Sequence, residues 1–300
     1  MSEILLKAGT GELEIIEFMV DSKYYAINVL KVKGIVQIDN ITPLPQMTGA
    51  VAGLTNIRGE MNTVIDLRQV LHKKSTADYT KSLGLLCEFN ETIIVFLVDR
   101  VEGIKRIMWE DIKQTNQVQE DTLSIGSILD NEKIIIMLDF ESITIASHIG
   151  QGYEVRSETL GEIVEKTQPI IVAEDSKAIG EMVKCSLVEA GYRNVTLFHN
   201  GQEAKDYIFE LKAKWGERFK EKASLLITDI EMPMLDGYTL TKYIKEDEVL
   251  KSLKVIIFSS LITAELRHKG ETVGADLQIS KPSMKGLIKV VDQLVEDGVI

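Results

Sequence analysis

The sequence contains no apolar run long enough to cross a membrane as a helix. Its longest apolar stretches, such as residues 134–138 and 255–258, fall far short of the ~18 residues that a spanning helix needs. The N-terminus also lacks the basic segment followed by an apolar stretch that marks a secretory signal. We therefore expect a cytoplasmic protein without direct membrane insertion.

Cysteine is also scarce, and basic residues are fewer than acidic ones. The two cysteines, Cys87 and Cys185, lie in apolar sequence in different halves of the chain. That context favours two buried free thiols over a disulfide or a metal-binding pair. Acidic residues outnumber basic ones by 46 to 34, and neither half shows the basic face that nucleic acid requires. The composition therefore argues against a nucleic-acid partner and against a transcription factor.

The length and the distribution of polar residues predict two domains. A chain of 300 residues with 45% hydrophobic content can bury two separate cores. Strand-like segments stop near residue 147, and a polar stretch with three glycines follows until Pro169. We therefore predict a first domain at residues 1–148, a linker at 149–167 and a second domain at 168–300.

The first half of the chain reads as all-β. Short β-branched segments alternate with turn residues, and few of them reach helical length. This pattern predicts an antiparallel barrel or a pair of small barrels. The expected strands are residues 13–20, 24–29, 34–38, 51–56, 62–66, 83–89, 92–98 and 133–138.

One segment of this half, the Asn-Ile-Arg-Gly sequence at residues 56–59, has the composition of a hairpin turn. On spacing alone, the favoured interpretation is a plain hairpin with a solubilising arginine, in which Gly59 takes a positive φ. Together with the Asp-Leu-Arg sequence at 66–68, however, it resembles the signature of CheW-type chemotaxis coupling domains. The resemblance covers roughly residues 12–145.

This resemblance implies an adaptor built from two small β-barrels. Members of that family dock to the cytoplasmic tips of chemoreceptors and to the CheA histidine kinase. Carried over by motif, Asn56, Arg58 and Gly59 are expected to lie at or beside the receptor-facing surface.

The second half alternates between strand and helix patterns. Apolar strand segments at residues 170–173, 195–198, 225–228, 255–258 and 277–279 are separated by segments of helical periodicity. Such alternation predicts an α/β doubly wound, five-stranded parallel sheet. In sheets of this kind, ligands bind beyond the carboxyl ends of the strands.

Polar side chains follow four of these strands. Glu174 and Asp175 follow the first, Asp229 the third, Ser259 the fourth and Lys281 the fifth. Each alone has a simple structural explanation, such as a helix start or a turn, but their order at successive strand ends favours one shared site. Three gathered carboxylates repel one another, so a cation is expected to offset them. Oxygen ligands suit Mg²⁺, and the lysine supplies a second positive charge.

These residue types suit phosphoryl transfer. A carboxylate can attack phosphorus and form an acyl phosphate. A metal ion and a lysine neutralise the charge on the phosphoryl oxygens, and a serine hydroxyl can donate to one of them.

The segment at residues 229–237, with the serine and lysine that follow Asp229 by 30 and 52 positions, resembles the receiver domain of two-component response regulators. The position three residues before the lysine, often aromatic in that family, is Gln278 here. The resemblance implies that Asp229 is the phosphoacceptor. It implies a metal site formed by Glu174, Asp175, Asp229 and the main-chain carbonyl of Glu231. It also implies that Ser259 provides the switch hydroxyl and that Lys281 is the phosphate-sensing lysine.

The two halves together resemble the CheV type of chemotaxis coupling protein. The resemblance implies an adaptor that links chemoreceptors to CheA and is regulated by phosphorylation of Asp229. An alternative is a phosphate sink for CheA that the adaptor half merely places at the receptor array. We expect no enzyme beyond Mg²⁺-dependent self-phosphorylation and self-dephosphorylation, because the β-rich half shows no nucleophile paired with a base.

Overall fold

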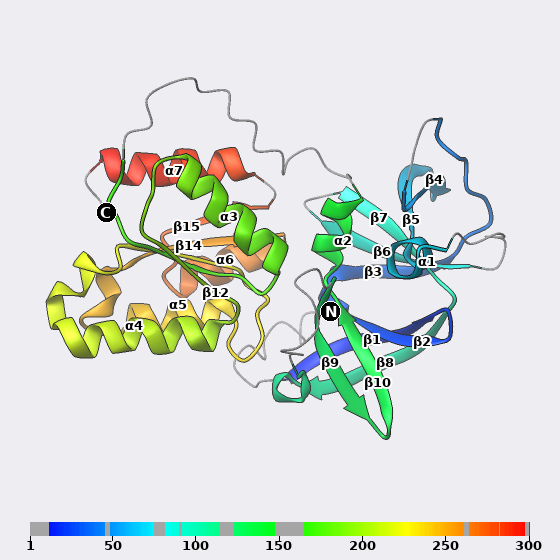
Figure 1. The fold of residues 1–300 in the computed structure, drawn as a ribbon, viewed down its shortest axis with the longest axis horizontal. Coiled ribbons are helices and arrows are strands. Elements are labelled where there is room, and N and C mark those ends of the chain that lie inside the picture. Colours follow the sequence, from blue (N-terminus) through cyan, green and yellow to red (C-terminus); the bar gives the residue numbers. More distant parts are fainter. Residues whose placement is uncertain are drawn as a thin grey trace. The chain divides into compact units, whose positions relative to one another are not determined.

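The computed structural model describes residues 12–45, 49–74, 82–89, 92–113, 123–147, 165–260, 264–281, 283–297 and 300. The chain forms two compact units, one over Glu12–Ile149 and one over Gly150–Ile300 (Figure 1). Of the predicted linker at 149–167, residues 149–164 lie outside the described part. No helix in the described ranges is long and apolar enough to cross a membrane.

The first unit contains two five-stranded sheets. In the first sheet the strand order is β8-β1-β2-β10-β9, and in the second it is β3-β6-β7-β5-β4. The strands are β1 (Glu12–Val20), β2 (Lys23–Asn28), β3 (Val32–Gln37), β4 (Val51–Ile57), β5 (Glu60–Asp66), β6 (Leu83–Phe89), β7 (Thr92–Val98), β8 (Arg100–Met108), β9 (Ser124–Asp130) and β10 (Lys133–Leu138).

Each of these sheets is closed by a short bridge between its edges. Lys113, just beyond β8, exchanges backbone hydrogen bonds of 2.8 and 2.9 Å with Ser127 of β9. Thr42, beyond β3, pairs in the same way with Leu54 of β4, again at 2.8 and 2.9 Å. Closure satisfies backbone groups that an open edge would expose, so the predicted pair of small barrels is confirmed. Most ladders are antiparallel, but β2–β10 and β5–β7 are parallel.

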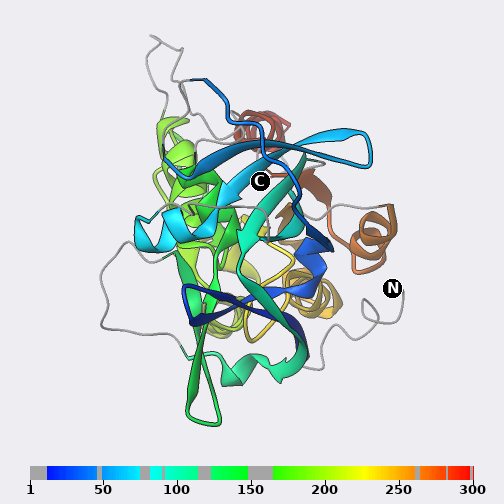
Figure 2. The same cartoon turned by 90° about the vertical axis from the view of Figure 1, so that its right-hand side faces the viewer.

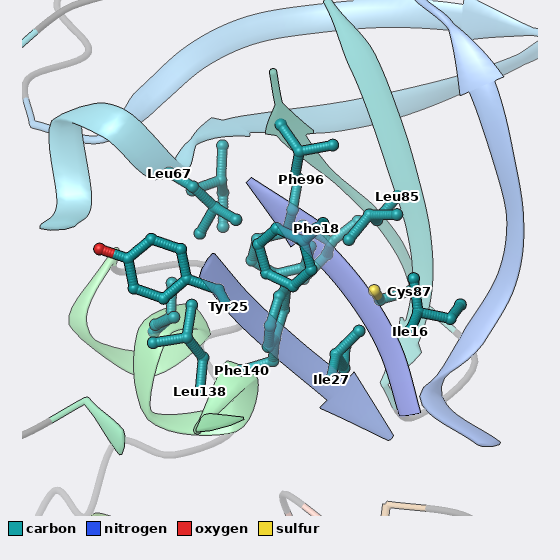
Figure 3. Packing of buried hydrophobic residues seen from close by; sticks show 14 of the residues in the cluster. Ile16, Phe18, Tyr25, Ile27, Leu67, Leu85, Cys87, Phe96, Leu138 and Phe140 are labelled. Atoms are coloured by element: carbon teal, nitrogen blue, oxygen red, sulfur yellow. The ribbon is translucent and has the colours of Figure 1, made fainter. Parts of the chain in front are cut away.

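One hydrophobic cluster contains residues from both sheets of this unit. Figure 3 shows Phe18 from the first sheet at the centre of this cluster, between Tyr25 of the same sheet and Leu85 of the second. Two short helices, α1 (Leu67–His72) and α2 (Phe140–Ala146), add side chains to the same cluster. The rings of Phe96 and Phe140 pack edge to face, with their centroids 4.6 Å apart. The β-strands of the two sheets therefore fold as one packed domain.

The two thiols differ in their surroundings. Cys87 is buried in this core, and burial raises the pKa of its thiol well above the usual value. The prediction for Cys185 was wrong, because this thiol is exposed. It lies on α3 between Val183 and Leu187, two positions from each, and these two side chains turn to the core.

The second unit is a parallel sheet of five strands in the order β12-β11-β13-β14-β15, as predicted. Helices α3 and α7 pack together, and so do α4 and α5; in Figure 1 the two pairs lie on opposite sides of the sheet. The elements are β11 (Ile170–Ala173), α3 (Lys177–Glu189), β12 (Val195–Phe198), α4 (Gly201–Trp215), β13 (Leu225–Thr228), α5 (Gly237–Glu246), β14 (Lys254–Ser259), α6 (Ala264–Thr272), β15 (Leu277–Ser280) and α7 (Met284–Glu296).

The strand order reverses at β11, which lies between β12 and β13. The chain passes to one side of β11 first and to the other side afterwards, so the loops that leave β11 and β13 diverge. Figure 2, turned by 90° from Figure 1, shows most clearly the strands of the first unit, in blue to green. Open α/β sheets bind their ligands at this point of reversal, beyond the carboxyl ends of the strands.

Candidate functional site

The carboxyl ends of β11, β13, β14 and β15 meet at one edge of the second unit's sheet. Ala173 pairs with Thr228, and Ser259 pairs with Ser280, so the residues that follow these strands start at similar heights. The backbone N–H of Asp229 donates to the carbonyl of Ala173 at 2.9 Å. The predicted convergence of the polar residues at this edge is present in the structure.

Three carboxylates form the acidic part of the site. Glu174, Asp175 and Asp229 each place one carboxylate oxygen within 4.8 Å of the other two. Glu174 and Asp229 are only 2% and 3% exposed, and Asp175 is half-buried. Buried carboxylates at this spacing require a nearby positive charge, and a metal ion held by the three oxygens can provide it.

Lys281 supplies a further positive charge within the same cluster. Its side chain is fully buried, and Nζ lies 3.0 and 2.8 Å from the two carboxylate oxygens of Glu174. The distance from Nζ to Oδ2 of Asp229 is 3.3 Å. The other oxygen, Oδ1, accepts the backbone N–H of Ile230 at 2.7 Å. The backbone therefore holds one oxygen of Asp229, and the other faces the ammonium group.

The loop after Asp229 is fixed at both ends. The N–H of Gly237 donates to the carbonyl of Ile230 at 3.0 Å, and Asp236 caps α5 by accepting the N–H groups of Tyr238 and Thr239 at 3.0 Å each. A Cβ on Gly237 would lie 1.9 Å from the carbonyl oxygen of Asp229. The start of α5 therefore presses directly on the backbone of the central aspartate.

The two remaining predicted residues of this edge lie in place. Ser259 is the last residue of β14 and is 1% exposed, and its carbonyl accepts the N–H of Lys281 at 3.0 Å. Glu231 is 8% exposed and lies two residues beyond Asp229. The role of its main-chain carbonyl as a metal ligand stays a prediction.

Two further residues lie at this edge although the sequence analysis did not select them. His199 directly follows β12, and its Nδ1 lies 3.3 Å from the carbonyl oxygen of Glu174. Tyr238 is 2% exposed and donates its hydroxyl to the carbonyl of Leu266 in α6 at 2.9 Å. Burial, together with the negative charges of Asp236, Asp229 and Glu231, raises the pKa of Tyr238, so the hydroxyl keeps its proton and remains a donor.

Gln278, the residue in the position that is often aromatic, is fixed to α6. Its Nε2 donates to the carbonyl of Arg267 at 2.7 Å. A Cβ on Gly270 would lie 2.4 Å from the amide of Gln278, so the helix and this side chain are in close contact. An amide bonded to the helix backbone therefore occupies the space between β15 and α6.

The three residues selected in the first unit form a separate feature. Asn56, Arg58 and Gly59 are exposed at the hairpin that joins β4 and β5. Arg58 and Gly59 have φ values of 55° and 93°, and the N–H of Gly59 donates to Oδ1 of Asn56 at 2.9 Å. This is the tight turn predicted from the sequence, with Gly59 at positive φ and the arginine exposed.

Comparisons with known proteins match each unit to one family. Residues 14–147 match the CheW-like domain, and residues 170–292 match the response regulator receiver domain. Among solved structures, the scaffolding protein TtCheW from Thermoanaerobacter tengcongensis is 23% identical, with a TM-score of 0.39 over 42% of this chain and 88% of its own. The receiver domain of the Francisella response regulator 1452 is 28% identical, with a TM-score of 0.38, and the match covers 44% of this chain and 99% of that domain.

Curated relatives contain both units in one chain. The chemotaxis protein CheV3 of Helicobacter pylori is 22% identical over 302 residues, which cover 95% of this chain and 96% of that protein. The chemotaxis protein CheV2 of the same organism is 26% identical over 273 residues, with 85% of each chain covered. The chain therefore joins a CheW-like domain to a response regulator receiver domain, and over most of its length it is similar to the chemotaxis proteins named CheV.

Proposed function

We propose that this protein is an adaptor that couples chemoreceptors to the CheA histidine kinase, and that phosphorylation of Asp229 regulates the coupling. The observation that supports it best is the buried Lys281, whose ammonium group lies between Glu174 and Asp229 at one edge of the receiver sheet. Such a cluster of opposite charges is suited to hold an anion beside a carboxylate nucleophile.

The oxygen donors at this edge fit Mg²⁺. Glu174, Asp175 and Asp229 present carboxylate oxygens within 4.8 Å of one another, and the carbonyl of Glu231 would complete the protein ligands. When bound, the ion supplies positive charge that offsets the negative charge on the phosphoryl oxygens. All remaining steps use side chains of this chain.

The phosphoryl group would be taken by Oδ2 of Asp229, because Oδ1 is held by the N–H of Ile230. As the O–P bond forms, the bond to the leaving group of the donor breaks, and its electrons leave with that group. Lys281, 3.3 Å from Oδ2, then pairs with a phosphoryl oxygen, and the hydroxyl of Ser259 donates to another. Water then attacks the phosphorus, the bond to Oδ2 breaks, and inorganic phosphate leaves while the carboxylate of Asp229 is restored. The chain thus acts as phosphoacceptor and scaffold.

The CheW-like domain would provide the adaptor surface. Its exposed hairpin presents Arg58, and the coupling partners are the cytoplasmic tips of chemoreceptors and CheA. Binding to them would recruit the protein to receptor arrays at the membrane. A change of state in the receiver would then bias how the adaptor domain acts on the kinase.

The first test is the site of phosphorylation. Incubation with Mg²⁺ and a small phosphodonor such as acetyl phosphate, followed by intact mass measurement, is expected to show one added phosphoryl group on the wild type and none on Asp229→Asn. Asp206→Asn is the matched control, since Asp206 is exposed on α4, and it should behave as wild type. Addition of a phosphoryl group to Asp229→Asn would contradict the proposal.

The same Asp229→Asn variant distinguishes an adaptor that is regulated by phosphorylation from a phosphate sink for CheA. In reconstituted arrays of receptor and CheA, a regulated adaptor predicts that the variant loses the phosphorylation-dependent change in kinase activity. A phosphate sink predicts unchanged control of CheA but longer phosphorylation of the other regulators that CheA serves. The two outcomes are read in the same experiment.

Arg58→Ala is expected to weaken binding to receptor fragments more than fivefold, because an arginine anchor at an interface typically contributes more than about 1 kcal/mol. The hairpin should persist, since its Gly59 to Asn56 hydrogen bond does not involve the arginine side chain. Arg100→Ala is the control, because Arg100 is an exposed arginine of β8 that pairs with Glu102. Sedimentation or pull-down with unchanged receptor affinity for Arg58→Ala would exclude this contact.

A further inference from the structure

Residues 165–167, where the chain enters the receiver, are attached to the segment that follows α3. The N–H of Lys166 donates to the carbonyl of Gly191 at 2.9 Å, and the N–H of Arg193 donates to the carbonyl of Lys166 at 3.3 Å. Nδ2 of Asn194 donates to the carbonyl of Thr167 at 2.8 Å. The last residues of the linker therefore form an isolated parallel bridge to the segment that follows α3.

A cluster of three side chains ties this bridge to α7. Nζ of Lys166 lies 2.6 Å from Oδ1 of Asp292, and the hydroxyl of Tyr192 donates to the same oxygen at 2.7 Å. The ammonium group also lies 4.6 Å from the ring centroid of Tyr192. Tyr192 is fully buried, and burial together with the bond to Asp292 raises the pKa of its hydroxyl. We call Lys166, Tyr192 and Asp292 the linker anchor.

Helix α7 connects the linker anchor to the phosphoacceptor pocket. It begins at Met284, three residues beyond Lys281, and carries Asp292 in its second half. Its 13 residues form a rod about 20 Å long, and Leu287 and Val291 are fully buried against the sheet. A displacement of Lys281 is therefore expected to shift the start of this helix, which lies only three residues further along the chain.

We propose that α7 transmits the phosphorylation state of Asp229 to the linker through the pair of Asp292 and Lys166. The inference rests on the proposed function and adds the route by which the receiver reports to the CheW-like domain. In the resting state Lys281 is held by Glu174 and Asp229. A phosphoryl group on Asp229 draws the ammonium group to its oxygens, and this shifts the start of α7.

The direction of the effect follows from the resting geometry. In the linker anchor, Nζ of Lys166 and the hydroxyl of Tyr192 already lie at hydrogen-bond distance from Oδ1 of Asp292, at 2.6 and 2.7 Å. We expect the shift of α7 to carry Asp292 away from Lys166 and to lengthen these contacts, so phosphorylation loosens residues 165–167. Loss of one partly buried pair of this kind corresponds to about fivefold more frequent opening of the backbone bonds that it protects.

Hydrogen exchange tests the proposal on the full chain. With acetyl phosphate and Mg²⁺, the amides of Lys166 and Arg193 are expected to exchange about fivefold faster in the wild type than without the phosphodonor. In Asp292→Asn the exchange should be fast in both conditions, because asparagine still accepts the hydroxyl of Tyr192 but lacks the negative charge that holds the ammonium group of Lys166. Lys166→Met removes the pair from the other side and should give the same result.

A matched control and a mass measurement separate the outcomes. Lys212→Met breaks another lysine–aspartate pair of the receiver, with Asp247, and should keep the wild-type response. Intact mass is recorded on every sample, and the anchor variants should take up the phosphoryl group as the wild type does. If the wild type takes up none, the proposed function fails and the inference with it. If it does and Lys166 exchanges at an unchanged rate, or if Asp292→Asn keeps the full response, the inference alone is overturned.

Discussion

Lys281→Met is expected to destabilise the receiver domain by about 3–5 kcal/mol in the absence of divalent ions. The substitution removes the ammonium group that contacts Glu174 at 2.8 Å and Asp229 at 3.3 Å while both carboxylates stay buried. Breaking a buried pair in this way leaves uncompensated charge, and that is more costly than losing the attraction alone. The free energy of unfolding in EDTA, measured with denaturant, gives the size of the effect.

The same variant should respond more strongly to Mg²⁺ than the wild type. In the variant the three carboxylates within 4.8 Å of one another have lost their lysine, so an added cation relieves more repulsion. We expect millimolar Mg²⁺ to recover a large part of the lost stability in Lys281→Met and to add much less to the wild type. Fluorescence of Trp215, in a Trp109→Phe background, reports unfolding of the receiver domain alone.

Lys254→Met provides the matched control for this prediction. Lys254 pairs with Asp276 at 2.8 Å, but Asp276 keeps a second partner, because Lys245 lies 2.6 Å away. Its loss should cost less than about 1 kcal/mol and should not change the response to Mg²⁺. Equal stability of Lys281→Met and wild type in EDTA, or equal gains with Mg²⁺, would show that Lys281 does not balance the acidic cluster.

Most of the receiver site could be predicted because a parallel sheet imposes its geometry on the sequence. Once the five apolar segments are read as parallel strands, Glu174, Asp229 and Lys281 must share one edge, whatever the loops do. The preference of Lys281 for Glu174 over Asp229 could not be foreseen. It depends on differences of a few tenths of an ångström that arise from packing.

His199 and Tyr238 were missed for different reasons. His199 follows β12 directly, so the same rule of strand ends would have placed it at this edge. The sequence analysis treated it as one of several scattered histidines. Tyr238 reaches Leu266 in another helix, and no local pattern predicts a contact between side chain and backbone across 28 residues.

In the CheW-like domain the missed elements lack a clear periodic signal. β8 has nine residues, none of them fully buried, and charged side chains at Arg100, Glu102, Lys105 and Arg106. Its alternation therefore does not separate an apolar face from a polar one. The helices α1 and α2 have six and seven residues, too few for helical periodicity, although Asp66 and Asp139 cap them.

Gly237→Ala is expected to destabilise the receiver domain by about 2–3 kcal/mol and to slow phosphorylation of Asp229 by about a hundredfold. The new Cβ would lie 1.9 Å from the carbonyl oxygen of Asp229 and 2.9 Å from its carbonyl carbon, so α5 or Asp229 must move. Both contacts are to backbone, which cannot rotate away. A displacement of about 1 Å at a nucleophile is enough for a loss of this size in rate.

Gly286→Ala is the control for this prediction. It adds a methyl group to a helix of the same domain, but without a contact to the backbone of Asp229. There the nearest atom, at 2.4 Å, is the hydroxyl oxygen of Ser283, which can turn aside, so stability should change by less than about 1 kcal/mol. Rates of phosphoryl uptake from acetyl phosphate, followed by mass, and denaturant unfolding give the two readouts. A normal rate in a folded Gly237→Ala would mean that the position of Asp229 does not depend on the start of α5. The loop would then adjust independently of the helix, although the bond from Gly237 to Ile230 and the cap by Asp236 tie them together.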